Sequence, residues 1–290
     1  MKKTSLLVIG ALFILLSGSC FAQVVDEEQE STENRDSFYE KSIYRKAKKP
    51  FEYPYVSEDD VVWGKRVWRV IDFREKMNQV FYYPIQEDQG RKNLFTIIDE
   101  AAKAGEIQLY KDDSFREVAD YAAIIAGAGS TTSSELTQTN LDGEEIIIDT
   151  NIFINMSPEE VKSMRIKEDW YIDKKRSVQD VRIIGFALIY LKDRGDGSAP
   201  QPYPLGWVRY DDPAVRNLLA NEEVFNPKND VERRSYDDVF VKRLFTSYVI
   251  RTSNTFGRKI SDYLTGFDAL YESQNIEEDI FNYEQDMWEY

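Results

Sequence analysis

The sequence predicts an α+β protein, a mixture of helices and antiparallel strands with an N-terminal extended arm. Residues 166–173 and 181–191 read as a long antiparallel pair of strands. Ser235 is a typical helix start, because a capping hydroxyl is followed three residues later by an acidic side chain. Pro50 and Pro54 keep the end of the arm extended, since proline fixes φ and restricts the residue before it.

Residues 1–22 have the order of a cleavable secretory signal peptide. Lys2 and Lys3 precede an apolar stretch over residues 6–16, and small residues follow before the cleavage that we expect after Ala22. An apolar helix of about eleven residues spans about 16 Å, roughly half of the hydrocarbon thickness, so it is too short for a membrane anchor. Later apolar runs are also short, and we therefore expect a soluble, exported, periplasmic protein.

Cys20 leaves an alternative open, because a cysteine shortly after an apolar run is the lipid-accepting residue of bacterial lipoproteins. Such a signal usually has an aliphatic residue three positions earlier, where this sequence has Ser17. We therefore expect Cys20 to be removed with the signal peptide. The mature chain then contains no cysteine and forms no disulfide, so its stability depends on an ordinary core.

The composition is acidic and lacks histidine, with a net charge of −15 over 290 residues. Removal of Lys2 and Lys3 with the signal peptide takes the net charge to −17, and such a surface repels nucleic acid and anionic membranes. The absence of histidine removes the commonest general base, the commonest zinc ligand and the usual catalytic triads.

Residues 23–56 are predicted to be a disordered leader followed by a basic and aromatic arm. Residues 23–35 are acidic and polar with almost nothing to bury. The arm then interleaves aromatic with basic side chains, namely Phe38, Tyr39, Lys41, Tyr44, Arg45, Lys46, Lys48, Lys49, Phe51, Tyr53 and Tyr55. Two interpretations stay open: a strap across its own domain, or an arm that docks on an acidic neighbouring subunit.

Residues 57–126 are predicted to be a helix-rich N-terminal region. The predicted elements are helices over residues 57–78, 93–104 and 113–126 and a strand over residues 106–110. Ser57 and Asp60 resemble a capping box at the start of the first helix, and Gly105 is a typical C-terminal cap of the second.

Residues 127–139 are small and hydroxyl-rich and are predicted to be a flexible linker or loop at a domain boundary. Residues 140–290 are then an α+β C-terminal region with a docking tail. Its predicted elements are strands over 145–148, 152–154, 166–173, 181–191 and 205–210, and helices that start at Ser157, Asp212 and Ser235, the last running to about Ser253. Gly185 predicts a bulge or a close backbone approach inside its strand.

The end of the chain, residues 276–290, is acidic and aromatic. Solvated tails rarely carry so many aromatic side chains, so we expect this tail to dock on its own domain or on a partner.

A search of the sequence for catalytic patterns yields no catalytic, cofactor-binding or metal-ligating residues. Acidic clusters stand at predicted helix starts, where capping explains them. The loop over residues 193–197 has glycines where a calcium loop needs ligands, and there is no phosphate-binding glycine loop or nucleophile elbow. Two other classes stay open: an exported carboxylate-dependent glycan hydrolase, with two carboxylates facing across a cleft, and a polysaccharide- or peptide-binding module.

Several blocks of the sequence resemble the gliding motility protein family GldN and its relative PorN. The blocks are the tryptophan-rich run over residues 53–78, Tyr82-Tyr83-Pro84, Glu168-Asp169-Trp170, Ile183-Ile184-Gly185, Leu205-Gly206-Trp207, and the end of the chain over residues 281–290. Together they cover essentially the whole mature chain.

The resemblance implies a structural subunit of the type IX secretion and gliding machinery, held in the periplasm at the inner face of the outer membrane. It implies pairing with an outer-membrane lipoprotein of GldK/PorK type, a large ring of many copies, and contact with an inner-membrane motor complex of GldL/GldM (PorL/PorM) type. It carries over no catalytic residue, so we expect no enzyme. From the residues themselves, the candidates for partner contacts are Tyr39, Tyr44, Arg45, Lys48, Lys49, Phe51, Tyr53, Tyr55, Phe281, Tyr283, Trp288 and Tyr290.

Overall fold

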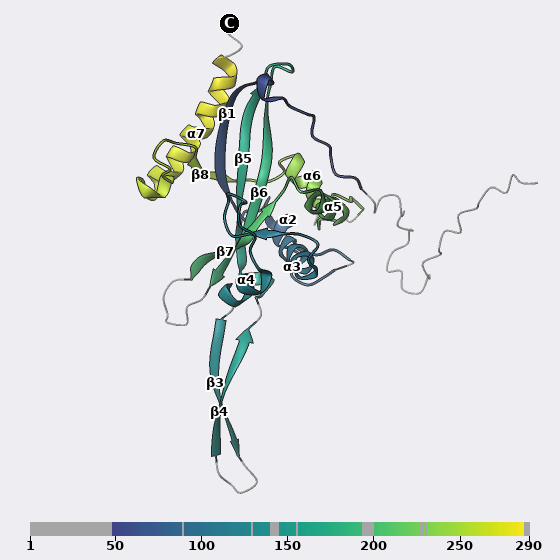
Figure 1. The fold of residues 1–290 in the computed structure, drawn as a ribbon, viewed down its shortest axis with the longest axis vertical. Helices are drawn as coiled ribbons and strands as arrows, with labels where there is room; N and C mark the ends of the chain where they lie inside the picture. Colours follow the sequence, from purple (N-terminus) through teal and green to yellow (C-terminus); the bar gives the residue numbers. More distant parts are fainter. Residues whose placement is uncertain are drawn as a thin grey trace, which may run out of the picture. The chain divides into compact units, whose positions relative to one another are not determined.

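Helices and antiparallel strands share the described part of the chain, which confirms the α+β class (Figure 1). The computed structural model describes residues 48–88, 90–128, 130–139, 145–154, 156–192, 200–226, 229 and 231–286. The predicted signal peptide, Cys20 and the leader up to residue 47 lie outside the described residues.

The elements follow one another along the described chain. The helices are α2 (Gln79–Tyr82), α3 (Leu94–Ala104), α4 (Tyr121–Ala128), α5 (Pro213–Asn221), α6 (Tyr236–Val241) and α7 (Phe267–Asp286). The strands are β1 (Val61–Asp72), β2 (Leu109–Tyr110), β3 (Ser130–Thr139), β4 (Glu145–Ile154), β5 (Val161–Asp173), β6 (Val178–Lys192), β7 (Gln201–Arg209) and β8 (Tyr248–Thr252). Short 3-10 turns are η2 (Glu58–Asp60), η3 (Pro158–Glu160) and η4 (Ile260–Asp262).

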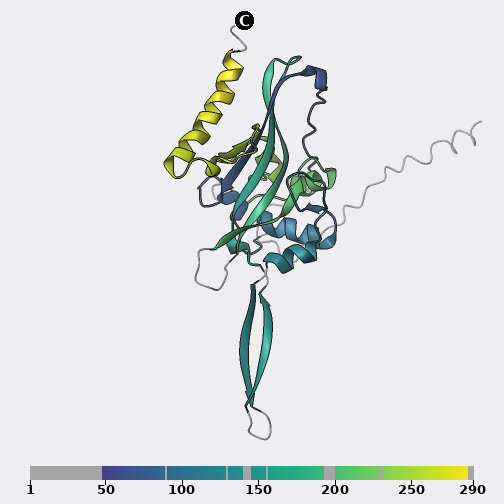
Figure 2. The same cartoon turned by 60° about the vertical axis from the view of Figure 1, so that its left-hand side comes forward.

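One antiparallel sheet with the strand order β2-β7-β6-β5-β1-β8 organises the fold, as Figure 2 shows from a second side. The predicted pair over residues 166–173 and 181–191 is confirmed as β5 and β6. Their register shifts beside Gly185, and a Cβ atom on this glycine would lie 2.5 Å from the Val208 carbonyl oxygen. The predicted bulge and the predicted close approach are therefore both present.

The helix predicted over residues 57–78 is wrong, because Val61–Asp72 is strand β1. The spacing of its apolar residues matches a helical period. In the strand, however, successive side chains point to opposite faces, with Val67, Arg69 and Ile71 on one face and Trp68 on the other. Arg69 is buried on the inner face of β1, where it hydrogen-bonds to Ser247. A charged residue therefore occupies a position at which the alternating pattern of a strand predicts an apolar one. Several β-branched residues in the run favour a strand.

Three further predictions need correction. The helix predicted over 113–126 begins only at Tyr121, because Phe115 adopts a positive φ and its segment forms a loop. The loop predicted over 127–139 is largely strand β3, which pairs with β4 in a separate hairpin. The helix predicted over 235–253 ends at Val241, Arg243 has a positive φ, and β8 follows.

Strands from both sides of the β3-β4 hairpin join the large sheet. β1 pairs with β5, and β2 pairs with β7. The segment predicted as a domain boundary therefore interrupts one sheet, and all described residues fall in one compact unit.

Side-chain caps fix the starts of three helices where the sequence predicts them. Asn93 accepts from the Thr96 amide at the start of α3, and Asp212 accepts from the Ala214 amide at the start of α5. Ser235 and Asp238 form a capping box on α6. At the other end of α3, Gly105 adopts the left-handed conformation expected of a C-terminal cap.

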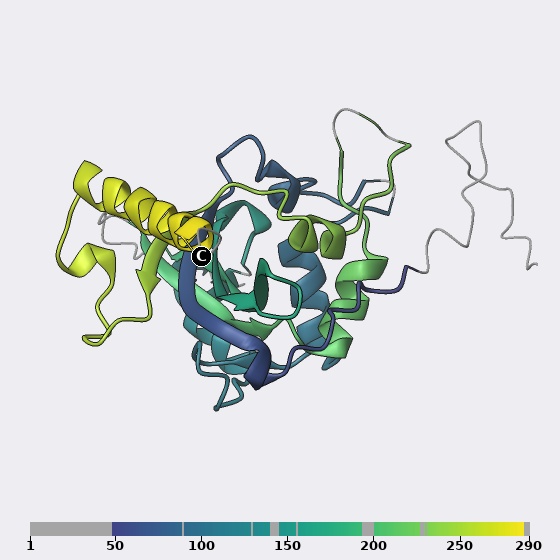
Figure 3. The ribbon, with the colours of Figure 1, turned by 90° about the horizontal axis from the view of Figure 1, so that it is seen from above.

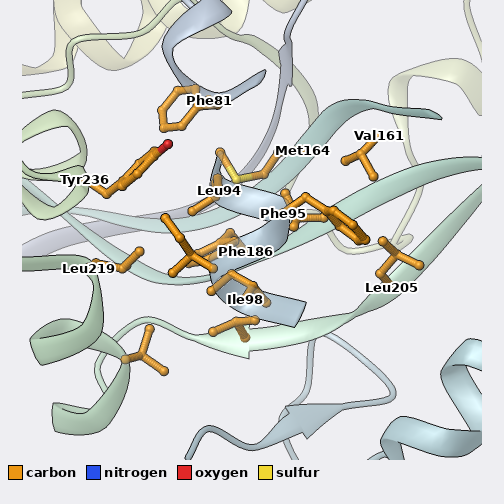
Figure 4. Packing of buried hydrophobic residues seen from close by; sticks show 14 of the residues in the cluster. Phe81, Leu94, Phe95, Ile98, Val161, Met164, Phe186, Leu205, Leu219 and Tyr236 are labelled. Atoms are coloured by element: carbon orange, nitrogen blue, oxygen red, sulfur yellow. The ribbon is translucent and has the colours of Figure 1, made fainter. Parts of the chain in front are cut away.

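The main core lies between the sheet and helices α3, α5 and α6. Figure 4 shows Met164 and Phe186 of the sheet close to Leu94 of α3, within a cluster that also contains Tyr236. Phe240 of α6 stacks on Phe186 with ring centroids 5.4 Å apart. These fully buried aromatic residues dominate the packing, because each removes a large apolar area from water.

Replacement of Gly185 by alanine tests the close approach in β6. The added methyl group overlaps backbone, so we expect a loss of about 1–3 kcal/mol in the free energy of unfolding, measured by urea denaturation. Gly64→Ala in β1 is the matched control, because its Cβ meets its nearest neighbour, the Trp170 carbonyl oxygen, at 3.5 Å, an ordinary contact. Equal losses in both variants would contradict this account of the bulge.

Candidate interaction sites on the N-terminal strap and the C-terminal helix

Residues 48–57, here called the strap, lie against the same chain. Lys48 donates to the Arg233 carbonyl and pairs with Asp238 at 3.3 Å. The Phe51 amide donates to Asp237 Oδ2 at 3.1 Å. The described part of the arm therefore follows the first interpretation, a strap across its own domain.

A buried ion pair between α5 and α6 receives the strap. Arg216 Nε donates to Asp237 Oδ1 at 2.7 Å, and the Tyr210 hydroxyl donates to the same oxygen at 2.7 Å. Arg216 also donates to the Phe51 carbonyl at 2.6 Å. Both charged side chains are buried, so their polar atoms need hydrogen-bond partners within the protein. The backbone of Phe51 in the strap supplies one partner to each of them.

Tyr53 of the strap lies between two guanidinium groups. The Arg182 and Arg216 centres lie 5.1 Å and 4.8 Å from the ring centroid, a cation–π arrangement. Burial raises the pKa of the Tyr53 phenol, although Arg216 nearby favours the ionised form. In contrast, Tyr55 is 92% exposed and Phe51 is 56% exposed, so the strap also presents aromatic side chains outward.

Helix α7 packs one face on β1 and β8. Ile276 and Ile280 are buried in a cluster with Val67 and Val249. Ser273 Oγ accepts from the Val249 amide at 2.7 Å, which fixes the helix against the edge strand. This satellite cluster holds the C-terminal helix, up to residue 286, on its own fold.

Polar contacts reinforce the attachment of α7. Arg69 on the inner face of β1 pairs with Glu277, and Arg69 Nε donates to Ser247 Oγ at 2.8 Å. Tyr283 stacks on Trp63 with ring centroids 4.8 Å apart. Trp63 belongs to the tryptophan-rich run, and its contact links the two ends of the described chain.

The outer face of α7 has no such cover among the described residues. Phe267, Leu270, Tyr271 and Phe281 are 90%, 56%, 66% and 58% exposed. At 3.6 residues per turn Phe267 and Tyr271 lie roughly opposite the buried isoleucines, whereas Leu270 and Phe281 lie at the margin of that side, and Phe281 also lines a cleft between α7 and the sheet. We call these four residues the outer stripe. The helix carries seven carboxylates and no basic residue, so the stripe lies in an acidic surface.

A cleft of about 390 Å³ lies between α7 and the sheet. Its described lining includes the paired Arg69 and Glu277 together with Arg243, Trp170 and Gln179. The Arg243 guanidinium forms an ion pair with the Glu168 carboxylate, with a nitrogen–oxygen distance of 2.7 Å, and its central carbon lies 5.3 Å from the centroid of the Trp170 ring. Glu277 is the one carboxylate in that described lining, and a glycosidase needs two facing carboxylates, so this cleft does not have the form of a glycosidase site.

The opposite face of the sheet is closed by a loop. Trp68 Nε1 donates to Asp113 at 2.8 Å, and the Lys167 ammonium lies 5.7 Å and 5.2 Å from the centroids of Trp68 and Phe115. Burial lowers the pKa of Lys167, although Asp113 nearby favours its charged form. Because Lys167 donates to the Asp113 carbonyl, its role here is to hold the loop.

Within the described ranges, no group of three or more carboxylate or cysteine side chains is placed to hold a metal ion. None of the described helices combines the length and apolar character needed to cross a membrane.

The predicted contact residues divide into three groups. Lys48 and Tyr53 make intramolecular contacts, as does Tyr283. The exposed residues are Lys49, Phe51, Tyr55 and Phe281. The remaining candidates, Tyr39, Tyr44, Arg45, Trp288 and Tyr290, lie outside the described residues.

Sequence reasoning missed the outer stripe apart from Phe281. A signal was present, because Phe267, Leu270 and Tyr271 follow the spacing of a helix face. It also missed the Arg216–Asp237 pair, which no local pattern reveals, because the two residues come from different helices.

The fold and these surfaces define an α+β protein that presents aromatic side chains on its strap and on its C-terminal helix. The family model described as gliding motility associated protein GldN matches residues 56–289. The chain therefore belongs to the GldN family, and it is a component of the gliding motility and type IX secretion machinery. A search of curated proteins finds no match.

Loss of the Arg216 charge tests the anchoring of the strap. In Arg216→Met, Asp237 loses its buried partner, so we expect a loss of about 3–5 kcal/mol in the free energy of unfolding. We also expect faster tryptic cleavage after Lys48, whereas the bond after Lys49 resists trypsin because Pro50 follows it. Arg74→Met removes an exposed ion pair and should change stability by less than about 1 kcal/mol. Unchanged cleavage in Arg216→Met would show that the pair does not hold the strap.

Adjacent residues on α7 test its two faces. Ile280→Ala leaves a void under the helix and should cost about 2–5 kcal/mol, with faster hydrogen exchange in α7. Phe281→Ala, its neighbour on the exposed side, should change stability by less than about 0.5 kcal/mol. Similar effects of both changes would mean that α7 does not pack through the face assigned here.

Proposed function

We propose that this chain is a structural, non-enzymatic subunit of the periplasm. It pairs with an outer-membrane lipoprotein of GldK/PorK type and, with other copies of itself, forms a large ring under the outer membrane. The inner-membrane motor complex of GldL/GldM (PorL/PorM) type contacts this ring. Export through residues 1–22 brings the chain to that place, and the lipidated partner holds it there.

The outer stripe of α7 is the observation that supports this proposal most. Four large apolar side chains lie on one exposed helix face, and exposed aromatic residues of this kind supply much of the binding energy at interfaces. Membership of the GldN family supports the assignment to the secretion and gliding machinery.

The strap supplies a second surface for contact. Its backbone is fixed by Asp237 and Arg216, so Phe51 and Tyr55 are presented from a rigid support. A preorganised surface loses little conformational entropy on binding, which favours a stable assembly. Lys49, exposed beside them, adds a positive charge on an otherwise acidic protein.

Point variants test the proposal without removing whole segments that the fold needs. One variant changes Phe267, Tyr271 and Phe281 to serine, and another changes Phe51 and Tyr55 to serine. The control changes Met77 and Val118 to serine, which are exposed to a similar degree elsewhere. Each is expressed in the native cell in place of the normal chain.

The measurement is the amount of lipoprotein that copurifies with each variant from outer-membrane fractions. We expect at least one surface variant to lose about 90% of the copurified lipoprotein, because removal of interface hot spots weakens binding by about 2 kcal/mol or more. The control should retain it. Normal copurification by both surface variants would overturn the assignment of these surfaces. Absence of any lipoprotein with the unaltered chain would overturn the proposed function itself.

A further inference from the structure

The outer stripe of α7 lies beside a row of negative charge. By the helical repeat, Asp268, Glu272, Asp279 and Asp286 follow one flank of the stripe, and the helix contains no lysine or arginine. Such a surface selects a partner that combines apolar or aromatic side chains with basic ones, since complementary charge steers association and excludes acidic partners.

The chain itself contains a segment with this composition. Residues 38–47, here called the arm segment, lie outside the described residues, so only their sequence enters the argument. It contains three aromatic residues, three basic residues and one acidic residue, in an otherwise strongly acidic protein. The members are Phe38, Tyr39, Glu40, Lys41, Tyr44, Arg45 and Lys46.

We propose that the outer stripe of α7 binds the arm segment of a second copy of this chain. The inference rests on the proposed function, because it names the contact by which copies join. The apolar residues of the arm segment cover the stripe, and its three basic residues lie along the acidic flank.

The positions of the two surfaces favour a contact between copies. The arm segment joins the fold at Lys48, which is bound at α6, whereas α7 packs on β8 and β1 at the edge of the sheet (Figure 1). Seen from above in Figure 3, α7 and the pair α5 and α6 lie on different sides of the long strands. The arm segment is thus attached at one place on the fold and the outer stripe lies at another, so a contact between copies would join two different parts of the chain in the head-to-tail manner that produces rings or filaments.

Cysteine crosslinking tests this contact directly, because Cys20 is the one cysteine of the chain. In a Cys20→Ser background, one population carries Ser42→Cys in the arm segment and another carries Gln274→Cys, which is exposed between the stripe residues on α7. The purified populations are mixed and oxidised. Lys103→Cys, exposed on α3, replaces Gln274→Cys as the control.

We expect a disulfide-linked dimer between the first two populations and about tenfold less with the control, because only a specific contact holds the thiols together. Reversal of the arm charges, Lys41→Glu, Arg45→Glu and Lys46→Glu, should reduce the dimer about tenfold. Reversal of Asp268, Glu272 and Asp279 to lysine should restore it with the reversed arm.

Two results would overturn the inference: no dimer between the two populations, or as much dimer with the Lys103→Cys control. Failure of this contact can be distinguished from failure of the proposed function. If the arm-reversed chain still copurifies with the lipoprotein while no dimer forms between the purified populations, this contact is wrong and the subunit role stands. If the dimer forms but no lipoprotein copurifies, the contact stands and the proposed assembly fails.

Discussion

Pairing of β1 with β5 is the constraint on which the rest of the structure depends. It joins residues 63–72 to residues 163–172 in one continuous antiparallel register, and the β3-β4 hairpin lies between them in the sequence. The pairing places Val67, Arg69 and Ile71 on one face, where Ile71 enters the main core and Val67 enters the cluster under α7. One strand thereby supports both the core and the C-terminal helix.

Ion pairs attach the two outer segments to the fold, the strap at α5 and α6 and helix α7 at β1. The Arg216–Asp237 pair holds the strap, and the Arg69–Glu277 pair joins α7 to β1. A buried charge is costly unless it is paired and hydrogen-bonded, so the buried Arg216, Asp237 and Arg69 favour the arrangement in which the strap and α7 are docked. The strap and α7 are therefore positioned parts of the fold, and their outward side chains are the ones left for contacts with other molecules.

The limits of prediction from the sequence have physical causes. Helix caps such as Asn93 and Ser235 act within four residues, so their elements could be predicted. β1 could not, because Arg69 stands at an inward position that is tolerated through partners far away in the sequence, Ser247 and Glu277. The sequence of the strap does not show which aromatic side chains face the fold: Tyr53 packs between two arginine side chains while Tyr55 is exposed, and residues distant in the sequence decide which.

The central claim is that α7 keeps its inner face on the sheet and uses its outer stripe for assembly. Hydrogen-exchange mass spectrometry of the free chain and of the isolated outer-membrane assembly tests it most directly. The account predicts that amides of residues 266–282 gain protection in the assembly, while those of the buried strand β5 keep the protection that they have in the free chain. Protection gained elsewhere on the fold, with none in α7, would contradict it.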